Sequence, residues 1–227
     1  MTAIAVATGL GFAVIGAAAE RIASVWPPDE ASRRGPGWRT ALFAVASGAS
    51  AGAIVYRSTL PAWATAVHLV VLTLLVLMSA TDLEQRRLPH LLLDPLIGIC
   101  ILFAFVNPTL SLLDALIGTG AAVALLGILG LLIRSGVALG DLYLVAPLGL
   151  LLGWPAIYAA IFIAALLVAT SSLVLLLSRR VGLKSYVPFG PFLVAGTVIT
   201  LLRDEDLLGA PAAAAATIVG ALLGHRY

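Results

Sequence analysis

Charged residues and cysteines are scarce in this sequence of 227 residues. Only 11% of the residues are charged, whereas a soluble domain carries roughly a quarter, and 61% are hydrophobic. An ordinary water-soluble globule is therefore excluded. The single cysteine, Cys100, excludes an internal disulfide framework and a thiolate zinc cluster, which both need several cysteines. The net charge of only +2 disfavours nucleic acid as a partner.

The sequence is rich in long apolar runs, separated by short gaps that contain charges or prolines. These runs approach the roughly 20 residues that a transmembrane helix needs. The sequence therefore predicts an all-α fold, a bundle of eight or nine transmembrane helices that forms a single integral-membrane domain over residues 1–227. The predicted spans cover residues 2–19, 40–56, 61–82, 91–106, 112–133, 135–153, 155–178, 186–202 and 207–224.

The basic residues predict how this bundle is oriented. With the N-terminus outside, eleven of the thirteen Lys and Arg residues fall in cytoplasmic segments, and Arg57 and Arg203 fall outside. The cytoplasmic set is Arg21, Arg33, Arg34, Arg39, Arg86, Arg87, Arg134, Arg179, Arg180, Lys184 and Arg226. The longest hydrophilic gap, residues 20–39, is predicted to be a cytoplasmic loop, because its prolines and glycines break helices.

Four aspartates lie within or at the edge of the predicted spans, and such residues are functional candidates because charge at bilayer depth is costly. Asp82 precedes Arg86 by four residues, which places it about 6 Å below the level of that arginine. Asp141 lies on the same side of the membrane, so the two carboxylates can face each other. Asp94 and Asp114 lie in the first turns of their spans, where we interpret them as ordinary helix-end carboxylates.

A resemblance to a known family enters at these two aspartates. The stretch Asp82-Leu-Glu-Gln-Arg-Arg-Leu-Pro-His90 is similar to the Asp-Leu-Arg-x-Arg-x-Ile-Pro-Asn segment of type IV prepilin peptidases, and the match includes Arg86, Arg87 and Pro89. The pair Gly140-Asp141 resembles the Gly-x-Gly-Asp signature of this class of intramembrane aspartyl proteases. Two departures are Ala138, which replaces the first glycine of the signature, and His90, where the family usually has Asn.

A third segment strengthens the resemblance. Residues 187–193 look like the Pro-Phe-Gly-Pro-Phe-Leu element of the same family, through Pro188, Phe189, Gly190 and Pro191. The three segments occur in the family's order, and the predicted peptidase core covers residues 61–202. The larger family members also carry paired Cys-x-x-Cys motifs and methylate the new N-terminus. This sequence lacks those cysteines, so it resembles the short, peptidase-only form, as in peptidases that serve tight-adherence pili.

The resemblance implies an intramembrane aspartyl endopeptidase of the bacterial inner membrane. Asp82 and Asp141 would be its catalytic residues, and its substrate a prepilin or pseudopilin cut after a glycine at the cytoplasmic membrane boundary. Such chemistry needs one ionised carboxylate that deprotonates water and one protonated carboxyl that polarises the carbonyl. It needs neither a metal nor a cofactor. The partners expected are therefore the prepilin and the lipid bilayer.

Two alternatives use other residues or another chemistry. Gly48-Ala-Ser50-Ala-Gly52 matches the Gly-x-Ser-x-Gly pattern, and with His68 it suggests an intramembrane serine protease. That motif works at a strand-to-helix turn, however, and here the same residues fit a small-residue face for helix packing. The other alternative is a small transporter or proton relay that uses Asp82 and Asp141.

Overall fold

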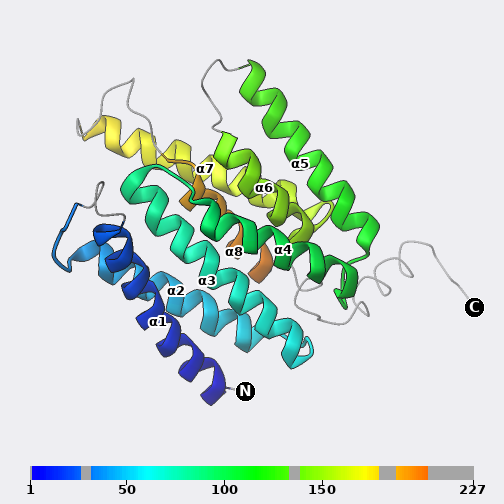
Figure 1. The fold of residues 1–227 in the computed structure, drawn as a ribbon, viewed down its shortest axis with the longest axis horizontal. Helices are drawn as coiled ribbons and strands as arrows, with labels where there is room; N and C mark the ends of the chain where they lie inside the picture. Colours follow the sequence, from blue (N-terminus) through cyan, green and yellow to red (C-terminus); the bar gives the residue numbers. More distant parts are fainter. Residues whose placement is uncertain (1, 27–31, 133–138, 179–187, 204–227) are drawn as a thin grey trace, which may run out of the picture.

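The computed structural model describes residues 2–26, 32–132, 139–178 and 188–203. These residues form eight α-helices, so the all-α prediction is confirmed for this part of the chain. In chain order they are α1 (Thr2–Val25), α2 (Trp38–Arg57), α3 (Ala62–Gln85), α4 (His90–Val106), α5 (Leu112–Leu132), α6 (Leu139–Leu152), α7 (Ala156–Leu177) and α8 (Gly190–Arg203) (Figure 1).

Five of the helices are long and apolar enough to cross a membrane: α1, α2, α3, α5 and α7. The other three, α4, α6 and α8, are apolar but have only 14 to 17 residues. Large hydrophobic side chains are exposed on the outer helices, including Leu10, Leu131, Phe162 and Leu177. A surface of this kind suits lipid contact, and the chain is a membrane protein with multiple spans. The predicted span at residues 207–224 lies outside the described residues.

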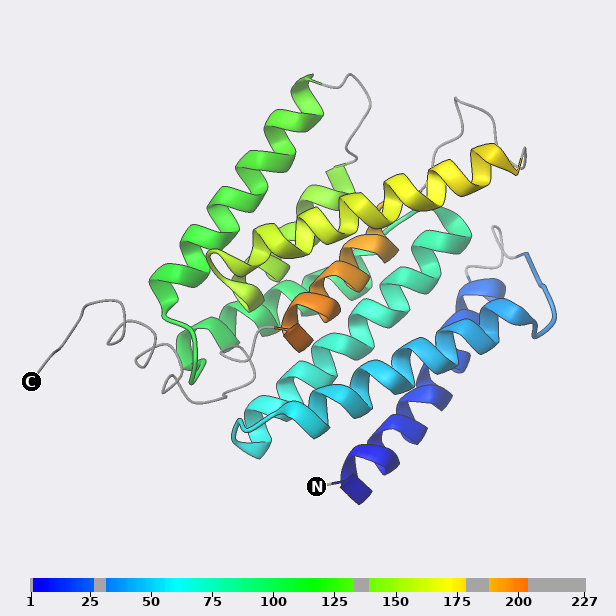
Figure 2. The ribbon, with the colours of Figure 1, turned by 180° about the vertical axis from the view of Figure 1, so that it is seen from behind.

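The helix α3 occupies the centre of the bundle. It lies between the α1–α2 pair on one side and α4, α6 and α8 on the other, as both ribbon views show (Figures 1 and 2). It is also the most buried of the five long helices. Asp82 lies on α3 and Asp141 on α6. Both of these helices contact α4 and α8, so α4 and α8 connect them.

Glycines allow α1 and α2 to pack closely. A Cβ atom at Gly48 would lie 2.7 Å from the Gly9 carbonyl oxygen, and one at Gly52 would lie 3.2 Å from the Ala5 carbonyl oxygen. These distances leave room for glycine at Gly48 but not for a side chain. The small-residue packing face predicted for residues 48–52 is therefore confirmed.

The helices on either side of the predicted loop at residues 20–39 are longer than expected. α1 continues to Val25, beyond the predicted end at residue 19, and α2 already begins at Trp38. The physical reason lies at Glu20, which is buried within α1 and accepts a hydrogen bond from the Thr40 hydroxyl at 2.7 Å. A charged residue with such a partner does not have to end an apolar helix.

Candidate active site

Asp82 lies in the last turn of α3 and is 7% exposed. The helix ends at Arg86, which has the left-handed backbone conformation with φ of 55° and whose N–H donates to the Asp82 carbonyl at 2.8 Å. Arg87 follows it and is exposed. Pro89 directly precedes α4, and its carbonyl accepts N–H groups from the start of that helix. Residues 86–89 thus form a sharp turn that ends α3 directly after Asp82.

Asp141 lies in the first turn of α6 and is 5% exposed. A carboxylate is stabilised there by the positive end of the helix dipole. The neighbouring Gly140 lies against the turn after α3, because a Cβ atom at this position would come within 3.3 Å of the Leu88 side chain. The first two motif segments are therefore packed against each other. Ala138, the departure from the family signature, lies outside the described residues.

The structure brings Asp82 and Asp141 close enough to interact electrostatically. The Oδ2 atom of Asp82 is buried and has no hydrogen-bond partner among the described residues. Buried polar atoms are almost always paired, and the exceptions in native structures often mark sites of chemistry. Two buried carboxylates from separate helices can hold one proton between them and activate a water molecule.

The third motif segment approaches the same carboxylate from α8. Gly190 is the first residue of α8, and a Cβ atom there would lie 2.6 Å from Asp82 Oδ2 and 3.3 Å from Asp82 Cγ. Any side chain at this position would collide with Asp82. The Gly190 backbone N–H faces the carboxylate, so the positive end of the α8 dipole is directed at it.

The residues around Gly190 explain why α8 begins at this point. The Phe189 carbonyl accepts the N–H groups of Phe192 at 3.1 Å and Leu193 at 3.0 Å, which caps the helix. Pro191 lies in the first turn, where a helix tolerates proline because the missing N–H would have no helical partner. Pro188 and Phe189 are half-buried beside it.

The other two described aspartates and His90 contact other groups. Asp94 is exposed, and its Oδ1 is 3.6 Å from Nδ1 of the exposed His90. The His90 ring packs edge-on against Tyr143 of α6. Asp114 accepts a hydrogen bond from the Ser111 hydroxyl at 2.6 Å in the first turn of α5. Asp114 thus has the geometry of a helix-end carboxylate, whereas Asp94 is an exposed carboxylate one turn into α4.

The described contacts do not join Ser50 to His68. The Ser50 hydroxyl donates to the Ala46 carbonyl of its own helix at 2.7 Å. The buried His68 places Nδ1 2.9 Å from the Ala64 carbonyl and packs edge-on against the Phe103 ring. Each side chain is therefore engaged with a helix backbone, and the part of the chain described here offers no nucleophile–base pair at these positions.

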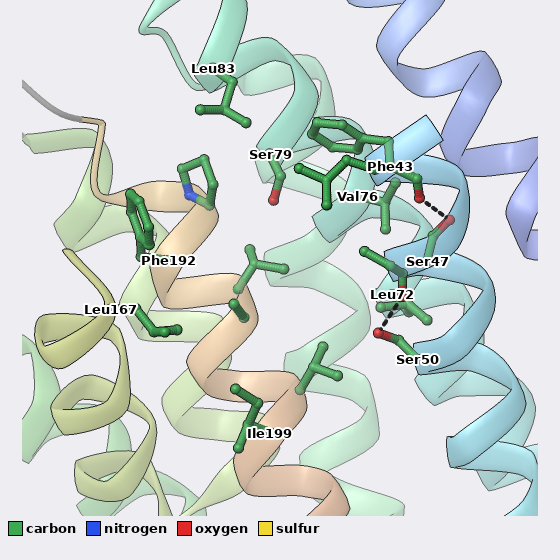
Figure 3. A pocket seen from close by; sticks show the side chains of 16 residues that line it. Phe43, Ser47, Ser50, Leu72, Val76, Ser79, Leu83, Leu167, Phe192 and Ile199 are labelled. Carbon is green, nitrogen blue, oxygen red and sulfur yellow. Dashed lines mark hydrogen bonds between the residues drawn. The ribbon is translucent and has the colours of Figure 1, made fainter. Parts of the chain in front are cut away.

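An apolar cavity of about 420 Å³ is lined by Leu83, the residue that follows Asp82 in the chain. It lies between α2, α3 and α8, with Ser79 and Leu83 on the α3 side and Pro191 and Phe192 on the α8 side (Figure 3). The lining Ser79 hydroxyl donates to the Leu75 carbonyl of its own helix. Serines bonded in this way leave the wall apolar, so the cavity suits aliphatic or aromatic groups rather than charged ones.

Sequence reasoning missed two acidic residues near this site, Glu20 and Glu84. Both side chains are buried and in contact with Arg34, and Glu84 also pairs with Arg39. The signal available was an acid close to a basic residue of a predicted cytoplasmic segment, with Glu20 next to Arg21 and Glu84 two residues before Arg86. Within the described ranges, no group of three or more His, Cys, Asp or Glu side chains is placed to hold a metal ion.

Comparison with known proteins adds an independent observation. Residues 69–173 match the model of the type IV leader peptidase family. The chain belongs to this family. The matched region contains Asp82 and Asp141 but ends before the segment at residues 188–191. The resemblance drawn from the motif segments is thereby confirmed at the level of the family.

Several relatives bear the name prepilin leader peptidase/N-methyltransferase. The protein of Aeromonas hydrophila is 33% identical over 152 residues, which cover 65% of this chain and 52% of the relative. That of Burkholderia pseudomallei strain 1026b is 34% identical over 171 residues, covering 73% and 55%. That of Bacillus subtilis is 25% identical over 139 residues, covering 61% and 56%. The chain thus spans about half the length of these curated relatives. No solved structure matches it significantly.

Proposed function

We propose that this chain is a membrane-embedded aspartyl endopeptidase that removes the leader of type IV prepilins or pseudopilins. The observation that carries the proposal is the placement of Asp82 and Asp141. They come from two family-like segments on α3 and α6, they are both buried, and they are close enough to interact electrostatically. Membership of the type IV leader peptidase family favours this function over a transporter that would use the same carboxylates.

In the proposed mechanism the two aspartates share one proton. The ionised carboxylate takes a proton from water as the water oxygen attacks the scissile carbonyl, and the protonated carboxyl stabilises the developing oxyanion. The C–N bond then breaks, and the amine leaves with a proton from the carboxyl that received it. Because the titrations of two such close groups belong to the pair, we assign the base and the acid to neither residue. Neither a metal nor a cofactor takes part in these steps.

The position of the pair supports a leader peptide as the substrate. Asp82 lies at the end of the bundle that carries Arg21, Arg34, Arg39, Arg86 and Arg87, which we call the basic end. An excess of basic residues is typical of the cytoplasmic side, so we place the basic end there, in the inner membrane. The names of the relatives specify prepilin leaders. The short helices α4, α6 and α8 would also cross the bilayer in this arrangement.

Two further features bear on the proposed activity: an apolar cavity and the small number of cysteines. The apolar cavity between α2, α3 and α8 would suit the membrane-embedded part of a prepilin. The relatives are also named N-methyltransferases, but this sequence has a single cysteine and lacks the paired Cys-x-x-Cys motifs of larger family members. We therefore propose peptidase activity alone.

The test is cleavage of a co-expressed type IV prepilin, followed as a shift to lower mass on a gel. We expect the native chain to shorten the prepilin, and the Asp82→Asn and Asp141→Asn variants to leave it intact. Asp94→Asn is the matched control, because Asp94 is an exposed carboxylate and should not affect cleavage. If Ser50→Ala abolishes cleavage while Asp82→Asn preserves it, the serine protease alternative is right. A transporter would leave the prepilin uncut in every case.

A further inference from the structure

A second group of buried acids lies at the basic end, on the other side of α3. Glu84 follows Asp82 by two residues, so the two side chains project about 200° apart around the helix. Glu84 belongs to a cluster formed by Glu20, Arg34, Arg39, Thr40 and Glu84, which we call the Glu84 cluster. The side chains of Glu20 and Glu84 are only 5% and 7% exposed.

The contacts of the Glu84 cluster join three helices and a loop. The Glu84 carboxylate forms ion pairs with Arg34 and with Arg39, whose Nη1 lies 3.2 Å from Glu84 Oε2. The Glu20 carboxylate accepts a hydrogen bond from Thr40 at 2.7 Å and lies 3.9 Å from Arg34 Nη2. Arg34 therefore lies between both acids. The members come from α1, the segment before α2, the first turn of α2 and the last turn of α3.

The cluster fixes the end of α3 because a buried carboxylate is costly unless it is paired. Each arginine presents several N–H donors in a planar fork, which suits contact with more than one acceptor. The next residue adds to this attachment, since the Gln85 amide donates to the Ala23 and Trp26 carbonyls at the end of α1. The last turn of α3 is thus tied to α1 and to the start of α2 through side chains.

This attachment bears on Asp82, because Asp82 belongs to the same turn. The Asp82 carbonyl accepts the Arg86 N–H that ends the helix, and terminal helical turns fray when nothing holds them. On the opposite face, the Asp82 carboxylate must stay against Gly190 and near Asp141. A small rotation or fraying of this turn would move the carboxylate away from both.

We propose that Glu84 is a positioning residue, whose ion pairs with Arg34 and Arg39 hold the last turn of α3 so that Asp82 stays opposite Asp141. This inference rests on the proposed peptidase function and deepens it. It assigns a role to the contact of Arg34 and Arg39 with the end of α3. In this contact Glu84 belongs to a motif segment, and the two arginines do not. The role is mechanical, and Glu84 does not contact the reacting atoms.

The test compares substitutions at Glu84 and Arg39 by the rate of cleavage of a type IV prepilin, normalised to the amount of folded enzyme. We expect Glu84→Ala to lower kcat about tenfold or more and to leave KM within about twofold, because misplaced catalytic groups slow the chemical step. Glu84→Gln should recover most of the loss, since its amide oxygen still accepts from the arginines. Arg39→Ala should lower kcat as well, and the double variant should be no slower than Glu84→Ala alone.

Two results would overturn the inference: a native kcat in Glu84→Ala, or losses in Glu84→Ala and Arg39→Ala that multiply in the double variant. If Glu84→Ala does not accumulate in the membrane, Arg39→Ala decides, and a native kcat there overturns it too. Asp94→Asn is the matched control at the same end. Failure of the proposed function is distinguishable, because the native chain would then leave the prepilin uncut, or Asp82→Asn would still cleave it. If Asp82→Asn is inactive while Glu84→Ala is native, only the positioning role is wrong.

Discussion

Two pairs of buried acids lie around the last turn of α3, and their surroundings differ. Glu20 and Glu84 are in contact with arginines and a threonine hydroxyl. Asp82 instead faces a second acid, Asp141, and the backbone of Gly190, and among the described residues its Oδ2 has no hydrogen-bond partner. Burial alone therefore does not distinguish a structural acid from a chemical one. Among the described residues, arginines neutralise Glu84, whereas Asp82 faces an acid and forms no ion pair.

The difference has a thermodynamic meaning. An acid that is paired with arginine contributes to the folded state, or at least offsets the cost of its own burial. An acid held next to another acid costs stability, and proteins retain such arrangements where function needs them. On this argument, substitutions in the Glu84 cluster should act on stability and geometry. Substitution of Asp82 should act on chemistry and leave stability intact.

The largest expected effect is that of removing either member of the pair. We expect Asp82→Asn and Asp141→Asn each to lower the rate of prepilin cleavage by at least about 100-fold, because general acid–base groups contribute that much or more. The rate is measured with purified enzyme in lipid vesicles and a prepilin substrate. Cleavage at more than a tenth of the native rate in either variant would remove that residue from the mechanism.

The next effect tests how closely α8 approaches Asp82. Gly190→Ala should lower the cleavage rate about tenfold or more, since the added Cβ would lie 2.6 Å from Asp82 Oδ2 and must displace it. Gly98→Ala in α4 is the matched control, because a Cβ there meets nothing within 4 Å. The same vesicle assay serves for both variants. Equal rates for the two would show that α8 does not hold Asp82.

The difference between the two pairs of acids can also be tested by the stability of variants, independently of their activity. Glu84→Ala should lower the free energy of unfolding by about 1–3 kcal/mol, because Arg39 loses its carboxylate partner and Arg34 keeps only its longer contact with Glu20. Asp82→Asn should preserve or raise the stability, because it ends the repulsion that two neighbouring acids must relieve by sharing a proton, and its amide can donate to Asp141. Thermal unfolding in detergent measures both. The opposite order of the two melting temperatures would contradict the distinction between the pairs.

The smallest effect is expected at Ser50. Ser50→Ala removes a hydroxyl that is bonded to its own helix and should change cleavage by no more than about twofold. The gel assay with co-expressed prepilin is sufficient for this comparison. A complete loss of cleavage would revive the serine protease alternative and would weaken the assignment of chemistry to the aspartates.

Much of the fold could be predicted from the sequence, because prolines and polar residues mark the helix ends. The predicted span at residues 91–106 differs from α4 by one residue at its start, and that at residues 112–133 differs from α5 by one at its end. The end of α1 was placed six residues too early. The charge of Glu20 marks the limit of an apolar run in the sequence, whereas its contacts with Thr40 and Arg34 depend on tertiary structure.

The candidate site was predictable only in part. The motif segments brought attention to Asp82, Asp141 and Gly190, but no sequence pattern gives the distance between a glycine Cβ position and a carboxylate 108 residues earlier. Glu84 was missed although it lies inside the first segment. Its partners, Arg34 and Arg39, are 50 and 45 residues away along the chain, so local spacing could not reveal the pairing.

The most direct test of the account is to measure cleavage and stability together in the Asp82→Asn variant. Purified enzyme in lipid vesicles is given a type IV prepilin, and the melting temperature is recorded on the same preparation. The account predicts that cleavage is lost while the melting temperature stays at or above that of the native chain. Native cleavage would contradict the central claim that the Asp82–Asp141 pair performs the chemistry. A loss of cleavage that comes with a lower melting temperature would contradict the claim that this pair is held at the expense of stability.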